Sequence, residues 1–82
     1  AAMDSLSVAA RERFERLRAW RRARAGEQGV PPYVIFHDAA LIEIARANPM
    51  RRADLAVVQG VGQAKLDRYG RDVLAALADG DD

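Results

Sequence analysis

The sequence of 82 residues contains no cysteine, which excludes a disulfide framework and any metal site built on thiolates. Its one histidine, His37, has neither a second histidine nor a carboxylate cluster to complete a metal site. Ser5 and Ser7 lie near the start of the chain, and no paired carboxylates share a helix face, so no nucleophile or acid–base pair can be assembled. We therefore expect a non-catalytic domain with no metal or cofactor of its own, in which His37 has a structural role.

Long hydrophobic runs are also missing. No apolar run approaches the roughly 20 residues of a membrane-spanning helix, and the start of the chain lacks the layout of a signal peptide. We expect a soluble, cytoplasmic protein with no membrane partner.

The 82 residues predict one small domain, too small for a deeply enclosed catalytic cleft. We expect this domain at residues 8–78, a linker or cloning remnant at 1–7, and a polar tail at 79–82.

Neither sign of charge is in large excess. The net charge of +1 argues against strong nonspecific binding to nucleic acid. The distribution is uneven, however, because residues 11–24 hold seven arginines and two glutamates, a local balance of +5, whereas residues 25–82 have a balance of −3. Within the basic segment, Arg11, Arg18 and Arg22 form a ridge at helical spacing, which we interpret as solvated surface.

Hydrophobic residues recur at steps of three and four early in the chain, the spacing of a helix with one buried stripe. We expect this helix from about Ser7 to Ala25, capped by Ser7 or Ser5 and ended by the glycines within residues 26–29. The stripe consists of Ala10, Phe14, Leu17, Trp20 and Arg21. Trp20 lies at its margin, and we expect it to pack against the core and not to serve as an exposed stacking surface.

Proline and glycine divide the rest of the chain into short elements. Pro31 and Pro32 stiffen a corner, so residues 33–36 are expected to be extended or a single turn. The other expected elements are a helix from His37 or Asp38 to Asn48 and a short helix at 51–58 with Leu55 and Val58 inward. A further helix follows the glycine connection with Leu66 and Tyr69 on its inner side, and a break at Gly70 separates it from a last helix. Because no alternating run predicts a strand, the fold class is all-α, a compact single-domain bundle of about five short helices.

Two glycines, Gly60 and Gly62, stand close together at a connection between two of these helices. Both permit a positive φ and a close backbone approach. The helix that follows presents unpaired N–H groups and the positive end of its dipole. Lys65 and Arg68 lie three residues apart on that helix. The arrangement favours a site for a phosphate.

Other residues near this site leave alternatives open. Arg51 and Arg52, one helix earlier, either extend the basic patch or serve only solubility. The acids Asp67 and Asp72 are close enough in sequence to pair with the two cations of the following helix. Tyr33 follows the double proline, a rigid corner that can hold its ring partly exposed for a base to stack on, at about 1–3 kcal/mol per base. The alternative is that Tyr33 caps the core.

Several segments occur in a fixed order along the chain: 14–21, 31–41, Ile44-Ala45 with Pro49, 60–62, and Lys65-Leu66 with Tyr69-Gly70. Together they resemble the HRDC domain, a family that takes its name from helicases and RNase D. The resemblance implies a helical bundle that acts as an accessory nucleic-acid-binding or regulatory module, most often of a bacterial RecQ-type DNA helicase. It also implies that Tyr33 and Lys65 contact single-stranded DNA, that ATP and Mg serve only the parent helicase, and that the protein is nucleoid-associated.

Three hypotheses follow. The first is weak backbone binding to single-stranded or partial-duplex DNA, which tunes the structures that the parent helicase binds and unwinds. Tyr33, Lys65 and Arg68 would carry this binding with the backbone at Gly60 and Gly62, and Arg51 and Arg52 would be secondary contacts. The second is an interdomain module that contacts the helicase core or a neighbouring domain of the same chain. The third is an RNA-binding accessory domain of an RNase D-like nuclease.

Overall fold

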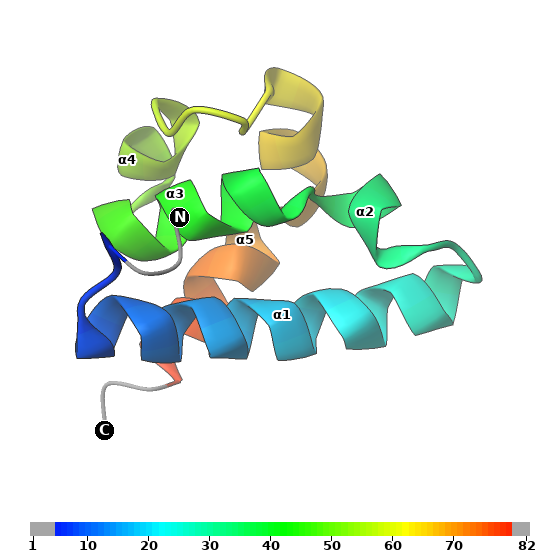
Figure 1. Ribbon diagram of the computed structural model, residues 1–82. Helices are drawn as coiled ribbons and strands as arrows, with labels where there is room; N and C mark the ends of the chain where they lie inside the picture. The colour runs from blue at the N-terminus through cyan, green and yellow to red at the C-terminus, as the bar shows by residue number, and fades with distance from the viewer. Residues whose placement is uncertain (1–4, 80–82) are drawn as a thin grey trace.

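The computed structural model describes residues 5–79, which form five α-helices and no strand (Figure 1). The helices are α1 (Val8–Gln28), α2 (Pro32–Ile35), α3 (Asp38–Ala47), α4 (Arg52–Ala56) and α5 (Gln63–Ala78). The all-α prediction is therefore confirmed. Most of the expected linker at 1–7 and of the expected polar tail at 79–82 lies outside the described residues.

The longest helix, α1, begins where the sequence indicated and ends three residues later than expected. The Ser7 side chain accepts a hydrogen bond from the Ala10 N–H at 3.1 Å, which confirms Ser7 as the N-cap. The helix continues through Gly26 because an interior glycine costs only about 1 kcal/mol. It ends at Gly29, whose φ of 67° is left-handed, and the Val30 N–H closes the cap on the Ala25 carbonyl at 3.0 Å.

A sharp corner links α1 to α3. Pro31 is the N-cap of α2, and the four residues of that helix are the single turn that the double proline predicted. Phe36 then returns to an extended conformation before α3 begins at Asp38. His37 occupies the N-cap position of α3 but makes no side-chain capping hydrogen bond. At its other end α3 stops at Asn48, with a φ of 47°, directly before Pro49.

The two glycines between α4 and α5 differ in conformation. Gly60 has a φ of 95°, as expected for a position that requires glycine. A Cβ built on Gly60 would lie 2.9 Å from the Ala40 Cβ, so the loop touches α3 at this point. Gly62 is the N-cap of α5 with a φ of −78°. Of the two glycines that permit a positive φ, only Gly60 therefore adopts one.

The predicted break at Gly70 is wrong, because α5 runs without interruption from Gln63 to Ala78. Gly70 is buried, and a Cβ there would meet the Leu66 Cδ1 at 3.3 Å and the Leu55 Cδ2 at 3.8 Å. Glycine at this position allows α4 to pack closely on α5, and burial of the Val73 side chain one turn later offsets its helix cost.

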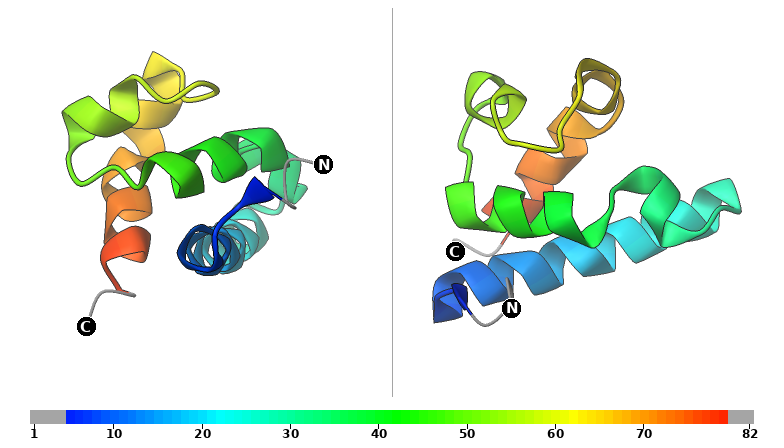
Figure 2. Two further views of the ribbon diagram at one scale, coloured as in Figure 1. Left: turned by 60° about the vertical axis from the view of Figure 1, so that its left-hand side comes forward. Right: turned by 45° about the horizontal axis from the view of Figure 1, so that its top comes forward.

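The core lies between α1, α3 and α5. In Figure 1, α1 and α3 run side by side and α5 crosses behind them; in the left view of Figure 2, α5 stands upright beside both helices. The largest fully buried side chains come from all five helices: Leu17, Ile35, Leu41, Ile44, Leu55 and Val73. Trp20 is half-buried and packs on Phe36 and edge-on to Tyr69, which confirms its expected packing role. None of the described helices is long and apolar enough to cross a membrane.

Candidate nucleic-acid interface

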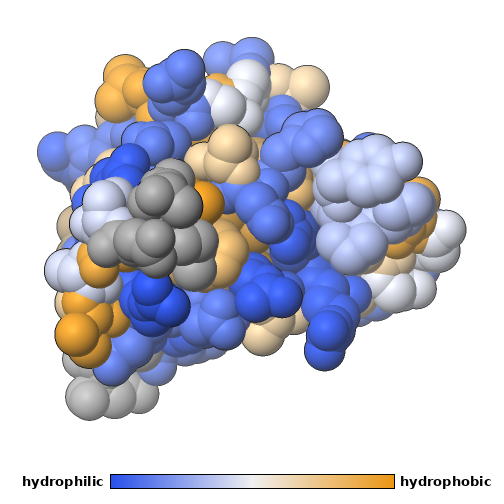
Figure 3. Space-filling model, in the orientation of Figure 1, coloured by the Kyte–Doolittle hydropathy of each residue, from blue (hydrophilic) through white to orange (hydrophobic). Residues whose placement is uncertain are grey.

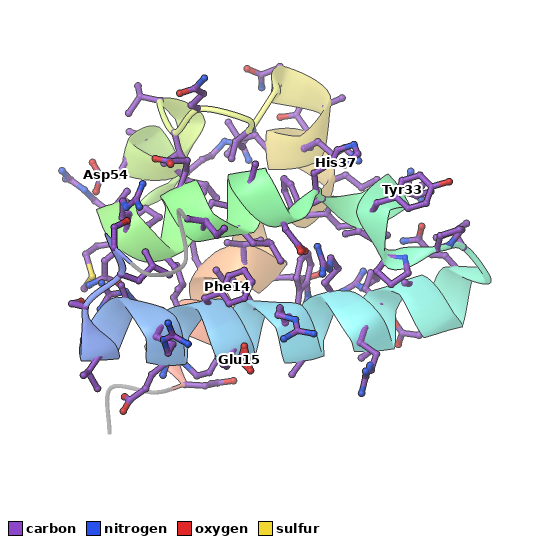
Figure 4. The ribbon with its side chains drawn as sticks, viewed as in Figure 1. Phe14, Glu15, Tyr33, His37 and Asp54 are labelled. Carbon is purple, nitrogen blue, oxygen red and sulfur yellow. The ribbon has the colours of Figure 1, made fainter. Side chains whose placement is uncertain are left out.

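Tyr33 projects from the corner and is 60% exposed, so it does not cap the core. The single turn of α2 directs Ile35 inward, and Phe36, which follows, is also buried. The Tyr33 ring lies against the ring of His37, with centroids 5.9 Å apart and planes inclined by 27° (Figure 4). The corner therefore presents two stacked rings at the surface, as a base-stacking site requires.

Arg21 of α1 fixes this corner from beneath. Its side chain is buried, and it donates a hydrogen bond from Nη1 to the Phe36 carbonyl at 2.8 Å. Its Nη2 atom lies 2.8 Å from the Asp38 Oδ1 in the first turn of α3. One buried guanidinium therefore joins α1 to both ends of the short segment between α2 and α3. The expected place of Arg21 in the buried stripe is confirmed.

Lys65 reaches the same corner from α5. Its ammonium donates to the Val34 carbonyl and lies 5.7 Å from the Phe36 ring centroid and 5.9 Å from that of Tyr69. Within the described residues, no carboxylate pairs with Lys65. The neighbouring acids are taken by arginines instead, Asp67 by Arg52 and Asp72 by Arg24. The positive charge of Lys65 is thus available to a ligand.

These groups border one surface hollow of about 610 Å³, which we call the Tyr33–Lys65 hollow. It is lined by Tyr33, Val34, Phe36, His37, Ala39, Ala40, Gly60 and Lys65. The structure therefore brings together the double-proline corner, the first glycine of the loop and the lysine of the next helix. Its walls are mostly apolar, with a cation at one side, which suits a base on an aromatic surface beside a phosphate.

Arg68 does not line this hollow, but it shares a neighbouring ring with Lys65. Its guanidinium carbon is 5.4 Å from the Tyr69 ring centroid, and the Lys65 ammonium is near the same ring. Arg68 also donates to the Gln28 Oε1 at 3.4 Å, and it has no carboxylate partner among the described residues. Gly62, the exposed N-cap of α5, begins the helix that carries both cations. The expected placement of Lys65 and Arg68 on one face of α5 fits their shared contact with the Tyr69 ring.

Arg51 and Arg52 lie elsewhere. The Arg51 Nε is 3.8 Å from the Asp54 Oδ2, and Figure 4 shows Asp54 at the opposite end of the molecule from Tyr33. Arg52 pairs with Asp67 and donates to the Leu66 carbonyl at 3.5 Å, so it connects α4 to α5. Neither arginine lines the Tyr33–Lys65 hollow. Their predicted role as secondary contacts therefore has less geometric support than that of Arg68.

His37 belongs to the hollow, although the sequence was interpreted as giving it only a structural role. Its side chain is exposed and makes no hydrogen bond with another described residue. The signal in the sequence that could have placed His37 beside Tyr33 was the spacing of four residues between them across a short turn. No group of three or more potential metal ligands occurs in the described part of the chain.

The surface around these residues is mixed. On the face shown in Figure 3, hydrophilic side chains gather over the middle of the molecule, and hydrophobic ones form small separate spots nearer the margins. Tyr33, Val34, Val8, Met50 and Val57 are the large exposed hydrophobic residues of the described segment. Only Tyr33 and Val34 of this set line the hollow that contains Lys65.

Comparison with known proteins explains this arrangement. The profile of the HRDC domain matches residues 10–77. The chain belongs to the HRDC domain family. As an HRDC domain it is 47% identical over 60 residues to the ATP-dependent DNA helicase RecQ of Bacillus subtilis, which covers 73% of this chain and 10% of that protein. It is 48% identical over 58 residues to the ATP-dependent DNA helicase UvrD2 of Mycobacterium tuberculosis strain H37Rv, covering 71% of this chain and 8% of that protein.

The HRDC fold is also shown by a solved structure. The D. radiodurans RecQ HRDC domain 3 superposes with a TM-score of 0.85 at 33% identity, over 89% of this chain and 96% of that one. The resemblance inferred from the ordered segments is therefore confirmed in both sequence and fold. The chain spans about a tenth of the length of the helicases that it matches.

Proposed function

We propose that this HRDC domain binds single-stranded or partial-duplex DNA weakly, through contacts with the phosphate backbone of the DNA. The observation that carries the proposal is that the exposed ring of Tyr33 and the unpaired charge of Lys65 line one hollow. In this arrangement a base stacks on the Tyr33–His37 rings while an adjacent phosphate accepts from Lys65. Arg68, which lies near the same Tyr69 ring as Lys65, is proposed to contact a neighbouring phosphate.

The proposed binding is weak and insensitive to sequence. Few cations contact the backbone, and no side chain of the hollow offers a bidentate pattern of the kind that reads base edges. We expect dissociation constants in the micromolar range or above at physiological salt. The domain itself is proposed to be non-catalytic, because the described residues supply neither a metal cluster nor a nucleophile with a base.

The proposed parent is an ATP-dependent DNA helicase, since two of the relatives carry that name and the matched segments are only 10% and 8% of their lengths. ATP and Mg would act in the helicase core of the parent protein and not in this domain. Because this domain would be tethered to the helicase core, even a weak contact would raise the local concentration of DNA. It would also bias which DNA structures the parent helicase binds. Contact of the HRDC domain with the helicase core is the alternative role.

The first test is titration of a fluorescent oligothymidylate into the domain at two salt concentrations. Tyr33→Ala should weaken binding by about 5- to 150-fold, the equivalent of about 1–3 kcal/mol for one stacked base. Lys65→Ala should reduce the magnitude of the salt slope by about 0.7, because one phosphate contact on a single strand is lost. Tyr33→Phe keeps the ring and should bind like the parent sequence.

Arg51→Ala is the matched control, because it removes the same charge as Lys65→Ala at the far end of the molecule. It should change affinity much less. Undiminished binding by the Tyr33→Ala, Lys65→Ala double variant would remove the proposed site. No binding of any oligomer at low salt, together with altered unwinding by surface variants of the full-length enzyme, would favour the interdomain role. Tighter binding of RNA than of DNA oligomers would favour the nuclease setting.

A further inference from the structure

A second hollow lies on the other side of the double-proline corner. It has a volume of about 420 Å³ and is lined by Glu15, Arg18, Ala19, Arg21, Arg22 and Pro32, and we call it the Arg22 hollow. Three of its six lining residues are arginines of α1. None of them was a candidate contact on sequence grounds, since Arg18 and Arg22 were interpreted as solvated surface.

The two hollows adjoin across α2. Pro32 lines the Arg22 hollow and the next residue, Tyr33, lines the Tyr33–Lys65 hollow. A four-residue helix is only about 6 Å long, so the chain that separates them is no wider than about one nucleotide step or two. Figure 4 shows Tyr33 and His37 at the α2 corner and Glu15, from the Arg22 hollow, on α1 below them.

The charges along this route are suited to a phosphate backbone. Arg22 is exposed and has no hydrogen-bond or ion-pair partner among residues 5–79. Arg18 pairs with Glu15 at 3.2 Å, but both side chains are at least half exposed, and such pairs contribute only about 0–1 kcal/mol. Arg18 uses only Nη1 for this pair, so its other guanidinium N–H groups can contact a phosphate while Glu15 stays neutralised.

Two carboxylates stand along the route, and each has an arginine partner: Glu15 lines the Arg22 hollow and pairs with Arg18, and Asp38 pairs with Arg21. Asp38 directly follows His37 and lies 2.8 Å from the buried Arg21, which itself lines the Arg22 hollow. Its charge is therefore compensated by a fixed partner. Without this pair, a carboxylate next to His37 would repel the phosphate that the route requires.

We propose that a strand bound at Tyr33 and Lys65 continues over Pro32 into the Arg22 hollow, where Arg22 and Arg18 each contact a further phosphate. The inference rests on the proposed function and extends it: the ligand is a single strand long enough to occupy both hollows. The domain then prefers longer single strands to short ones, and the α1 arginines supply the difference. The stacked rings at the corner lie between two cationic ends.

The test compares a short and a long oligothymidylate, of about 2 and about 15 nucleotides: the short one fills only the Tyr33–Lys65 hollow, and the long one exceeds the nucleotide steps that separate the two hollows. The parent sequence should bind the long oligomer more tightly than the short one. The Arg18→Ala, Arg22→Ala double variant should lose about fivefold in affinity per arginine for the long oligomer, with a salt slope reduced by about 1.4. Its affinity for the short oligomer should not change.

The matched control is Arg71→Ala, which removes an exposed arginine of α5 that lines neither hollow. It should leave the length dependence intact. If the long oligomer depends on Lys65 but is bound equally by the Arg18→Ala, Arg22→Ala variant, the extension is wrong and the proposed function stands. If no oligomer depends on Lys65 and Tyr33, both are wrong. Retained oligomer binding with lost binding of polyglutamate would assign Arg22 to an acidic protein partner and overturn the proposal.

Discussion

Replacement of Gly60 by alanine is expected to lower the free energy of unfolding by about 2–4 kcal/mol. The φ of 95° is unfavourable for any residue with a Cβ, at about 1–3 kcal/mol. The new Cβ would also lie 2.9 Å from the Ala40 Cβ and 3.3 Å from its Cα. The loop must then move away from α3, and an overpacked contact costs about 1–3 kcal/mol. Urea denaturation followed by circular dichroism measures the difference.

Gly62→Ala provides the matched control for Gly60. Gly62 has a φ of −78°, and a Cβ there meets nothing within 4 Å. We expect a change of less than about 1 kcal/mol, since the loss of a glycine N-cap opposes the reduced entropy of the unfolded chain. Equal destabilisation by the two variants would show that Gly60 is not held by contact with Ala40. Because Gly60 and Ala40 both line the Tyr33–Lys65 hollow, the Gly60 variant should also weaken oligonucleotide binding.

The second large effect is expected at Arg21. Arg21→Ala should destabilise the fold by about 2–3 kcal/mol, because it removes a charged hydrogen bond to the Phe36 carbonyl and buried side-chain packing. Asp38 adds little to this loss, since its exposed carboxylate can be hydrated once its partner is gone. Thermal unfolding should show a lower midpoint, and binding should weaken because the corner is no longer fixed.

Two variants separate the causes at this position. Arg21→Met keeps most of the packing and removes the charge, so it should be less destabilising than Arg21→Ala and still weaken the corner. Arg22→Ala, at the next residue but exposed, should change stability by no more than about 0.5 kcal/mol. A stable Arg21→Ala variant with an unchanged unfolding midpoint would show that α1 does not hold the corner through this guanidinium.

The helices could be predicted from the sequence because their signals are local. The three- and four-residue periodicity located α1, and the Asn48-Pro49 stop located the end of α3. Gly70 was interpreted wrongly, because its local helix-breaking tendency is weaker than the burial of α5 against α4. The helix propensity of a single residue does not show whether another helix, remote in the sequence, packs against it.

The candidate site was predicted less completely than the fold. Resemblance to a family pointed to Tyr33 and Lys65, and the structure places them around one hollow. Their partners were not predictable from spacing: Lys65 contacts the Val34 carbonyl 31 residues away, and Asp67 pairs with Arg52 across two helices. The stacking of His37 on Tyr33 depends on how the corner turns, and the burial of Arg21 beneath fixes that turn.

The contact between Lys65 and the Val34 carbonyl lowers the entropy cost of binding a ligand. A free lysine side chain loses up to about 2 kcal/mol of rotamer entropy when it is immobilised. Here the backbone acceptor and the faces of Phe36 and Tyr69 already restrain the ammonium in the unliganded domain. Most of that entropy is lost during folding, and the neutral acceptor leaves the full charge in place. An incoming phosphate therefore meets a preorganised cation.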